Sequence, residues 1–245
     1  MKNYMFVVSY DGAKYRGWQR LQDAVEKTIQ GKIELLLSKL LEEDIQIIGS
    51  GRTDAGVHAL MQVCNFKTKK TLSKDFIKNF NKYLPEDIRV LECKEVDERF
   101  HARHNVKKKT YMYRIDNSSF GNPFLRKYSY YIEDKLNIEK MKEASKLFLG
   151  EHDFTAFSKN NSKKKSTIKT IDNIEFKVEG DSIEIYFEAK SFLYNMVRMI
   201  VGTLIGVGLE QFDLEHIEKL FKENTRENHR FTAPPQGLFL CKVEY

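Results

Sequence analysis

The chain has 245 residues and carries 41 lysine and arginine side chains against 35 aspartates and glutamates, which gives a formal net charge of +6 and a sequence pI near 9.0. This length allows one large domain or two small ones, each with its own hydrophobic core. The basic balance suits a polyanionic partner. No apolar run reaches the roughly 18 residues that would cross a membrane, and the start lacks the pattern of a signal peptide, so we expect a cytoplasmic protein without a membrane span.

The three cysteines, Cys64, Cys93 and Cys241, are widely separated and lie in apolar, strand-like surroundings. Their odd number and spacing indicate neither a disulfide framework nor a zinc site. We therefore expect reduced thiols in the core.

The first half of the chain has the element order β-α-β-β-α-β, read from its apolar periodicity. The expected elements are a strand at Tyr4 to Tyr10, a helix from about Val25 to Leu41, two strands on either side of the loop that contains Asp54 (the first at Ile45 to Ile48), a helix carrying Phe76, Ile77, Phe80 and Tyr83, and a strand near Ile88 to Val96. This order is the ferredoxin-like pattern, in which two helices cover one face of an antiparallel sheet.

The second half repeats this order with one extra helix. The expected elements are strands at Val106 to Ile115, Ile171 to Val178, Ser182 to Ala189 and Leu238 to Glu244, and helices at about Asn137 to Leu149, Phe192 to Val207 and Asp213 to Phe221. We therefore expect an α+β fold of two tandem ferredoxin-like halves, residues 1–104 and 105–245, which share an extended antiparallel sheet. The sheet face opposite the helices and a cleft between the halves would be free for a large substrate.

The most informative stretch is the loop from Gly49 to His58, which reads Gly-Ser-Gly-Arg-Thr-Asp-Ala-Gly-Val-His. Its glycines permit a ligand to approach closely, and Arg52 is near enough to Asp54 to keep that carboxylate ionised. These features predict a functional site; the structural alternative is a glycine turn in which Asp54 caps the next residues and Arg52 is solvated. The loop completes neither a phosphate-binding P-loop nor a dinucleotide-binding glycine motif.

The string Gly-Arg-Thr-Asp-Ala-Gly-Val-His resembles the catalytic motif of the TruA family of tRNA pseudouridine synthases. Further short matches occur in family order along nearly the whole chain: Tyr10-Asp11-Gly12, Gly17-Trp18-Gln19-Arg20, Phe100-His101-Ala102-Arg103, Tyr111-Met112-Tyr113, Asp153-Phe154-Thr155, Met196-Val197-Arg198, Val201-Gly202, Ala233-Pro234 and Gly237-Leu238. The resemblance implies tandem ferredoxin-like domains with a catalytic cleft between them, and a homodimer that holds one tRNA.

The implied reaction isomerises uridine to pseudouridine without a metal or a redox cofactor. The enzyme would flip a uridine out of the anticodon stem-loop, at roughly positions 38 to 40 of the tRNA, because a stacked base cannot reach a protein side chain. Asp54 would be the nucleophile, at either the ribose C1′ or the uracil C6. Arg52 would fill the vacated space or grip a phosphate.

Three residues of the second half receive roles through the same resemblance. Tyr111 would stack on the flipped uracil and is a candidate proton relay, although spacing alone favours a strand aromatic in the core. Arg198 lies in an apolar helix, where its positive charge needs a polar or acidic partner. The resemblance implies an ion pair with Asp54. The alternatives are a side chain that extends to solvent or a pair with Glu210. Leu238 would give the base an apolar wall, or is simply core.

Clusters of basic residues are candidates for phosphate contacts. They are Lys107-Lys108-Lys109, Lys163-Lys164-Lys165, and Lys67 with Lys69 and Lys70. Arg103 and the triplet Lys163, Lys164 and Lys165 are our candidates for tRNA binding. The segment 158–167 is polar and cationic, so it is either an arm that orders on RNA or an unused surface loop. We interpret His101 and His104 as RNA-facing or structural residues.

Two other functions use the same features. A non-catalytic RNA-binding or chaperone module would need the basic clusters and the fold, but it gains nothing from the carboxylate of Asp54. A hydrolase built on Asp54 and His58 would need a further acid or a metal, and no third ligand is present at metal-site spacing.

Overall fold

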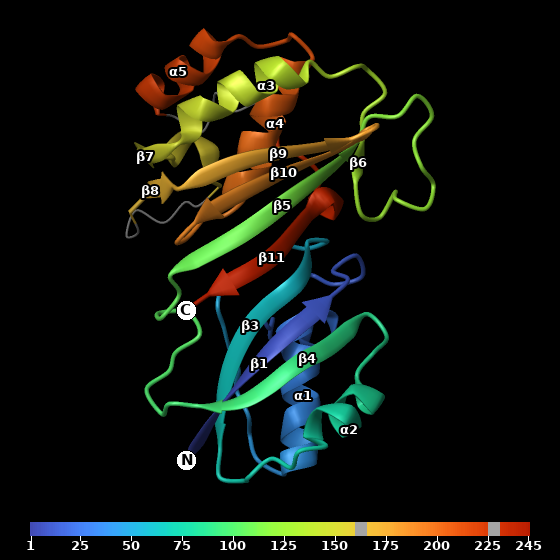
Figure 1. The fold of residues 1–245 in the computed structure, drawn as a ribbon. Helices are drawn as coiled ribbons and strands as arrows, with labels where there is room; N and C mark the ends of the chain where they lie inside the picture. The colour runs from blue at the N-terminus through green and yellow to red at the C-terminus, as the bar shows by residue number, and fades with distance from the viewer. Residues whose placement is uncertain (160–165, 225–230) are drawn as a thin grey trace. The chain divides into compact units, whose positions relative to one another are not determined.

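The computed structural model describes residues 1–159, 166–224 and 231–245, and these form two compact units (Figure 1). The first unit contains Met1–Lys107 and Phe239–Tyr245, which includes all of the last strand except its first residue; the second contains Lys108–Leu238. The last strand thus belongs with the first unit, whereas the sequence analysis grouped it with residues 105–245.

The first unit has an α+β arrangement around a central strand. Its elements are β1 (Lys2–Tyr10), a 3-10 turn (Val25–Lys27), α1 (Ile29–Leu41), β2 (Ile48–Gly49), β3 (His58–Thr68), α2 (Phe76–Tyr83), β4 (Ile88–Val96) and β11 (Leu238–Glu244). The strands are ordered β4-β1-β3, and β2 and β11 both pair with β3. The pairs of β1 with β3 and β4, and of β2 with β3, are antiparallel, whereas β11 runs parallel to β3.

The helix expected from Val25 to Leu41 is divided at Thr28. The backbone of Thr28 is extended, so the 3-10 turn ends there, and its hydroxyl accepts a hydrogen bond from the N–H of Gly31 at 3.2 Å. Thr28 is thus the N-cap of α1, a position where a threonine side chain satisfies a free N–H group.

The strand expected at Ile45 to Ile48 is also shorter, with only Ile48 and Gly49 in β2. Side chains of α1 take up the preceding N–H groups instead: Glu34 accepts from the N–H of Ile47 and Ser38 from that of Ile45, both at 2.9 Å. A backbone group bonded to a helix side chain cannot also extend a strand ladder. The buried Glu34 carboxylate therefore fixes residues 45–47 against the helix.

The two faces of the first sheet are both covered in part. On one face, Phe6 of β1 packs against Phe76 and Phe80 of α2. On the other, Met5 and Val7 join a cluster with Ala102, Phe100 and Tyr245. The expectation that the face opposite the helices would be free is therefore wrong where residues 100–102 and the last strand cover it.

The second unit is also α+β. Its strands are β5 (Lys108–Asp116), β6 (Tyr130–Tyr131), β7 (Gly150–Asp153), β8 (Ile168–Ile171), β9 (Asn173–Glu179) and β10 (Ser182–Ala189). Its helices are α3 (Ile138–Ser145), α4 (Met196–Gly208) and α5 (Leu214–Glu223), with 3-10 turns at Lys146–Phe148, Thr155–Phe157 and Pro235–Gly237. Strands β5, β10 and β9 are antiparallel neighbours, β6 runs parallel to β5, and β7 pairs with β8.

Parallel pairs in both units make the sheet mixed, which corrects the expected antiparallel sheet. In the second unit, residues 117–129 connect β5 to β6 as a long crossover, and such a connection allows parallel pairing that a hairpin does not. The expected alternation of β10 is confirmed, because Ile183, Ile185 and Phe187 are buried while the residues between them are partly exposed. Helix α4 is buried at all its positions except Arg198.

Candidate functional site

The loop that carries Asp54 joins β2 to β3, and buried side chains fix its first part. The hydroxyl of Ser50 donates to Oε1 of Gln62 at 2.6 Å, and Nε2 of Gln62 donates to the carbonyl of Gly51 at 3.1 Å. The N–H of Ser50 also bonds to the carbonyl of Val63 at 2.8 Å. Because Ser50 and Gln62 are fully buried, these bonds are shielded from water.

A second group of contacts holds the loop at Thr53, the residue before Asp54. The hydroxyls of Thr53 and Tyr10 are hydrogen-bonded at 2.8 Å, and the carbonyl of Thr53 accepts from the N–H of Trp18 at 3.1 Å. Trp18 is only 1% exposed. The backbone that leads into the catalytic candidate is therefore tied to β1 and to residues 17–18.

Gly17 allows this close approach. Its φ of +98° is a conformation that side chains with a Cβ rarely adopt, and a Cβ placed there would lie 2.6 Å from the carbonyl oxygen of Thr53 and 3.1 Å from the carbonyl carbon of Asp54. A glycine is thus required where the chain passes behind the Asp54 loop.

Asp54 itself is half-buried, between the buried Thr53 and the exposed Ala55. Its carbonyl accepts from the N–H of Val57 at 3.2 Å, which closes a turn. This turn presents the side chain of Asp54 from a backbone that is fixed before and after it, as a catalytic carboxylate requires.

The structure places His58 against β11 and against the turn after β1. Its ring is 1% exposed and stacks on Phe239 at a centroid distance of 4.7 Å, and its Nδ1 accepts from the N–H of Gly12 at 3.1 Å. His58 therefore holds β11 and the turn after β1 in place. Among the described residues, no group of three or more His, Cys, Asp and Glu side chains is arranged to hold a metal ion.

A pocket of about 350 Å³ opens beside the Asp54 loop. Its lining includes two arginines and two histidines, Arg52, Arg103, His101 and His104. The remaining lining consists of Trp18, Gln19, Gln30, Ile47, Ile48 and Gly49. Burial first, and then the positive charge of Arg52, lower the pKa of Arg103. The structure thus brings together two residues that the sequence analysis selected for tRNA binding.

The candidates of the second unit occupy three different elements. Tyr111 on β5 is 8% exposed and packs edge-on against Phe192 at 5.2 Å. Leu238, at the start of β11, is 6% exposed. Both side chains are largely buried. This burial agrees with a role against the uracil and also with a purely structural role in the core.

Arg198 lies in the first turn of α4 and is half-buried. Its Nε donates to the carbonyl of Ala233 at 2.7 Å and one terminal nitrogen donates to Oδ1 of Asn195 at 2.9 Å. Glu210, the alternative partner, is bonded instead to Lys140 at 2.8 Å.

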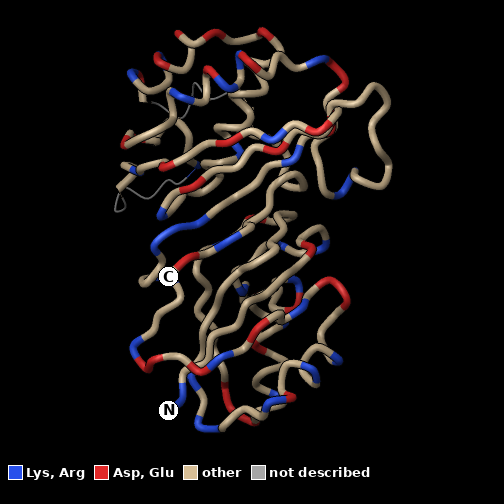
Figure 2. The backbone as a smooth tube through the Cα atoms, in the orientation of Figure 1, with Lys and Arg blue, Asp and Glu red and all other residues tan. Residues whose placement is uncertain are grey.

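The basic clusters are less uniformly cationic than their sequence suggested, and Figure 2 shows acidic residues interleaved with basic ones along the strands. Lys108 pairs with Glu188 at 3.0 Å, Lys109 is buried, and Lys70 pairs with Glu42 at 3.1 Å. The triplet Lys163, Lys164 and Lys165 lies outside the described residues.

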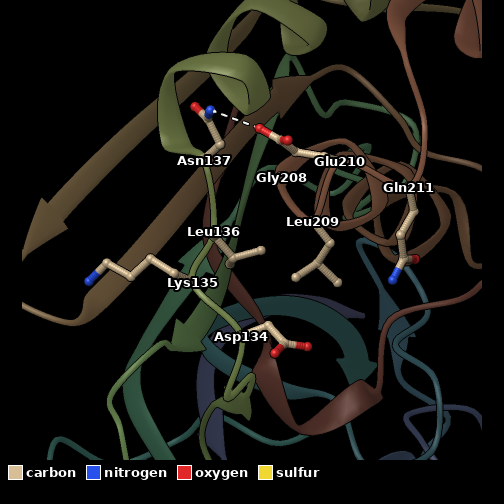
Figure 3. Close-up of a pocket in the computed structure, with 8 residues that line it drawn as sticks. All are labelled: Asp134, Lys135, Leu136, Asn137, Gly208, Leu209, Glu210 and Gln211. Atoms are coloured by element: carbon tan, nitrogen blue, oxygen red, sulfur yellow. Dashed lines mark hydrogen bonds between the residues drawn. The ribbon is translucent and has the colours of Figure 1, made fainter.

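Another pocket, of about 500 Å³, lies in the second unit between the start of α3 and the end of α4 (Figure 3). It is lined by Asp134, Lys135, Leu136, Asn137, Gly208, Leu209, Glu210 and Gln211. Asn137 caps α3 and also contacts Glu210 across the pocket at 3.5 Å. Among the described residues, none of the catalytic or tRNA-binding candidates selected from the sequence lines it.

Sequence reasoning did not find Tyr10, Thr53 and Gln62, which position the loop. Tyr10 and Thr53 are 43 residues apart, so no local pattern joins them. The only signal was that Tyr10 and Thr53 both lie within short stretches that match the family.

In the part of the chain that the structure describes, no helix is long and apolar enough to span a membrane. An aspartate on a fixed loop beside a pocket lined by two arginines is an arrangement typical of an enzyme that acts on a polyanionic substrate.

Comparison with known proteins identifies the family. The model of the tRNA pseudouridine synthase family matches residues 6–105 and 144–245. The chain is 47% identical over 246 residues to "tRNA pseudouridine synthase A 2" of Bacillus cereus, and 49% identical to "tRNA pseudouridine synthase A" of Bacillus sp. (strain KSM-64). It is 44% identical to the protein of that name from Thermoanaerobacter sp. (strain X514), and each alignment covers 100% of both chains.

The chain belongs to the tRNA pseudouridine synthase family, and it is an isomerase that converts uridine in tRNA to pseudouridine. The family and the activity predicted from the Asp54 motif are thereby confirmed.

Proposed function

We propose that this enzyme modifies uridines of the anticodon stem-loop and that Asp54 is its nucleophile. The observation that carries the proposal is the fixation of the Asp54 loop by buried hydrogen bonds at Ser50 and Thr53. A nucleophile gains from such fixation, since reacting atoms must be held in position before the reaction. A binding module would gain nothing from an anionic side chain held in this way.

The reaction needs a carboxylate, proton transfers and the exclusion of water. In one route, a carboxylate oxygen of Asp54 bonds to C1′ while the C1′–N1 bond breaks and its electrons stay on the uracil. The uracil turns over, C5 bonds to C1′ and displaces Asp54, the C5 proton leaves, and N1 takes up a proton. In the other route, Asp54 first adds to C6 of the uracil, and the electrons of the C5–C6 double bond move toward C5. The C1′–N1 bond then breaks with its electrons on N1, the uracil turns over, and C5 bonds to C1′. Loss of the C5 proton restores the C5–C6 double bond as the bond from C6 to Asp54 breaks, and N1 takes up a proton.

The uridine reaches Asp54 only after it flips out of its stack, at a cost of a few kcal/mol. Arg52 offsets part of this cost by entering the vacated space or by binding a phosphate. Tyr111 stacks on the flipped uracil and relays a proton, and Leu238 forms an apolar wall. Arg103 and the triplet Lys163, Lys164 and Lys165 contribute tRNA contacts.

Arg198 pairs with Asp54 in this proposal and orients its carboxylate. The guanidinium has one nitrogen on the carbonyl of Ala233 and another on Asn195, which supports a side chain held in one direction. Such a pair would link the two units at the reacting group.

The proposal includes two ferredoxin-like halves, residues 1–104 and 105–245, with one shared sheet and the catalytic cleft between them. The strand order β4-β1-β3-β2 of the first unit, with all three pairs antiparallel, supports this for the first half. The proposed assembly is a homodimer that holds one tRNA.

Modification mapping tests the choice of substrate region. An unmodified tRNA transcript, its isolated anticodon hairpin and its isolated T-arm hairpin are each incubated with the enzyme, and pseudouridines are located by carbodiimide treatment and sequencing. The proposal predicts modification of the anticodon arm in the transcript and the first hairpin only. Modification confined to the T arm would contradict it, and Asp54→Asn that still modified the anticodon arm would contradict the role of Asp54.

A further inference from the structure

Tyr245 directly follows β11 and packs beside the segment that leads to Arg103. Its ring contacts the ring of Phe100 at a centroid distance of 4.9 Å, and its hydroxyl donates to the carbonyl of Ala102 at 2.7 Å. All of these residues belong to the first unit. Tyr245 thus contacts the chain immediately before Arg103, which lines the pocket beside the Asp54 loop.

The same hydroxyl also contacts the loop that carries Asp54. Ser50 forms a side-chain hydrogen bond with Tyr245. Ser50 is fully buried and belongs to the first part of this loop, where the hydrogen bonds described above fix the backbone. The Tyr245 hydroxyl therefore lies between the carbonyl of Ala102 and the start of the Asp54 loop.

Buried side chains of the sheet hold residues 100–102 from the other side. The N–H of Ala102 donates to Oδ1 of Asn65 on β3 at 2.9 Å, and Nδ2 of Asn65 donates to Oδ1 of Asn3 on β1 at 3.0 Å. Nδ2 of Asn3 donates in turn to the carbonyl of Phe100 at 2.9 Å. Because two strands fix residues 100–102, the bond from Tyr245 joins the Asp54 loop to a fixed neighbour.

The hydroxyl of Tyr245 does more than its ring requires. The ring packs against a buried cluster that contains Met5, Val7 and Val63, and a phenylalanine would make the same apolar contacts. The hydroxyl adds polar contacts to two segments that carry residues of the site. Burial raises the pKa of this hydroxyl, so it stays protonated and can donate a hydrogen bond at neutral pH.

We propose that Tyr245 is a positioning residue for the isomerisation, and that its hydroxyl joins the loop of Asp54 to the segment that ends at Arg103. The inference rests on the proposed function, because it takes Asp54 as the group whose position matters. Without this hydroxyl, the start of the Asp54 loop loses its bond to a neighbour that β1 and β3 fix. The carboxylate is then presented less accurately to the flipped uridine, and the reaction slows.

The first test compares Tyr245→Phe with Tyr4→Phe, in which another tyrosine of the first unit loses its hydroxyl. The hydroxyl of Tyr4 accepts from the N–H of Leu72 at 3.1 Å, in the segment between β3 and α2. Both variants keep the ring and lose hydrogen bonds, so their urea midpoints should fall by similar amounts.

The rate of uridine conversion, measured in a single turnover at saturating enzyme, distinguishes these two variants. Tyr245→Phe should be slower than the parent on the order of tenfold, which is less than the roughly 100-fold expected for a displacement of about 1 Å. Tyr4→Phe should convert uridine at the parent's rate. Equal rates for Tyr245→Phe and Tyr4→Phe would overturn the proposal.

A double-mutant cycle tests whether Tyr245 acts through the Asp54 loop. Ser50→Ala removes the loop hydroxyl that bonds to Tyr245. The double variant Tyr245→Phe/Ser50→Ala should be about as slow as Ser50→Ala alone, because the second change removes a contact that is already lost. A double variant slower than Ser50→Ala by the full factor found for Tyr245→Phe would overturn the proposal, since the two residues would then act independently.

The parent enzyme and Asp54→Asn separate this inference from the proposed function. If the parent modifies the anticodon arm and Asp54→Asn does not, an unchanged rate for Tyr245→Phe contradicts the role of Tyr245 alone. Conversion by Asp54→Asn, or conversion by the parent outside the anticodon arm, contradicts the proposed function.

Discussion

Replacing Gly17 by alanine should disable the enzyme without unfolding it. Gly17 does not line the pocket beside the Asp54 loop and carries no reactive group, but it passes within van der Waals distance of the loop that presents Asp54. An added methyl group would lie 2.6 Å from the carbonyl oxygen of Thr53 and 3.2 Å from the N of Ala55. Since both neighbours are backbone atoms, the loop must move to make room.

Two effects set the magnitude. A residue with a Cβ at a φ of +98° costs about 1 to 3 kcal/mol in strain. Relief of the contact also displaces Thr53 and, with it, Asp54, and a misplacement of about 1 Å at a reacting group lowers the rate on the order of 100-fold. We therefore expect kcat to fall about 100-fold and stability to fall by a few kcal/mol.

Gly150→Ala is the matched control. Gly150 has a similar φ of +87°, yet an added methyl group would meet nothing within 4 Å, so this variant carries the strain without the contact. Urea unfolding gives the stability of both variants, and tritium release from tRNA carrying 5-tritiated uridine gives kcat. Gly150→Ala should lose stability and keep kcat. A folded Gly17→Ala enzyme with kcat within a few-fold of the parent would refute the claim that this contact positions Asp54.

Three other results are expected from the structure. Tyr10→Phe leaves the buried Thr53 hydroxyl without its hydrogen-bond partner, so the free energy of unfolding measured in urea should fall by about 1 to 3 kcal/mol. The same variant should lower kcat with little change in KM. An unchanged kcat would count against this hydrogen bond as a contact that positions Asp54. Burial raises the pKa of Asp116, but hydrogen bonds from the following loop have the larger combined effect and lower this pKa below the ordinary 3.8. The ionised Asp116 carboxylate therefore stabilises the fold above pH 3.8, and this stabilisation is lost as the pH falls through the lowered pKa. Asp116→Asn should therefore unfold at lower urea at pH 7 and show a flatter acid limb; parallel acid limbs would contradict this. Burial raises the pKa of Cys93 to about 11 and that of Cys64 further, so mass spectrometry should find both unmodified after brief iodoacetamide treatment of the folded enzyme at pH 8.

Much of the fold could be predicted because its elements have strong apolar periodicity. The expected strands at Ile88–Val96 and Leu238–Glu244 have the observed bounds. The errors arose where a side chain distant in sequence controls the backbone. Glu34 takes the N–H of Ile47 and so shortens β2.

Parallel pairing also could not be predicted. A strand pattern shows which residues face the core but does not show which strand lies beside it. The pairing of Phe239 with His58 joins positions 181 residues apart and depends on how the chain returns to the first unit.

The site divides in the same way. Asp54 and Arg52 could be selected as candidates from the sequence because their chemistry and their glycine-rich surroundings are local in sequence. Tyr10 and Gln62 were not found, since a tyrosine in a strand and a glutamine in a strand have many structural uses. Their role appears only when β1 and β3 are paired next to the loop.

The most direct test of the central claim compares tritium release by the parent enzyme, Asp54→Asn and Asp44→Asn, with 5-tritiated uridine in a full-length tRNA transcript. Asp44 is an exposed aspartate before β2, so its replacement removes the same charge away from the site. The parent and Asp44→Asn should release tritium at similar rates, and Asp54→Asn should release none while it binds the tRNA as well as the parent. Release by Asp54→Asn at a comparable rate would contradict the assignment of Asp54 as the nucleophile.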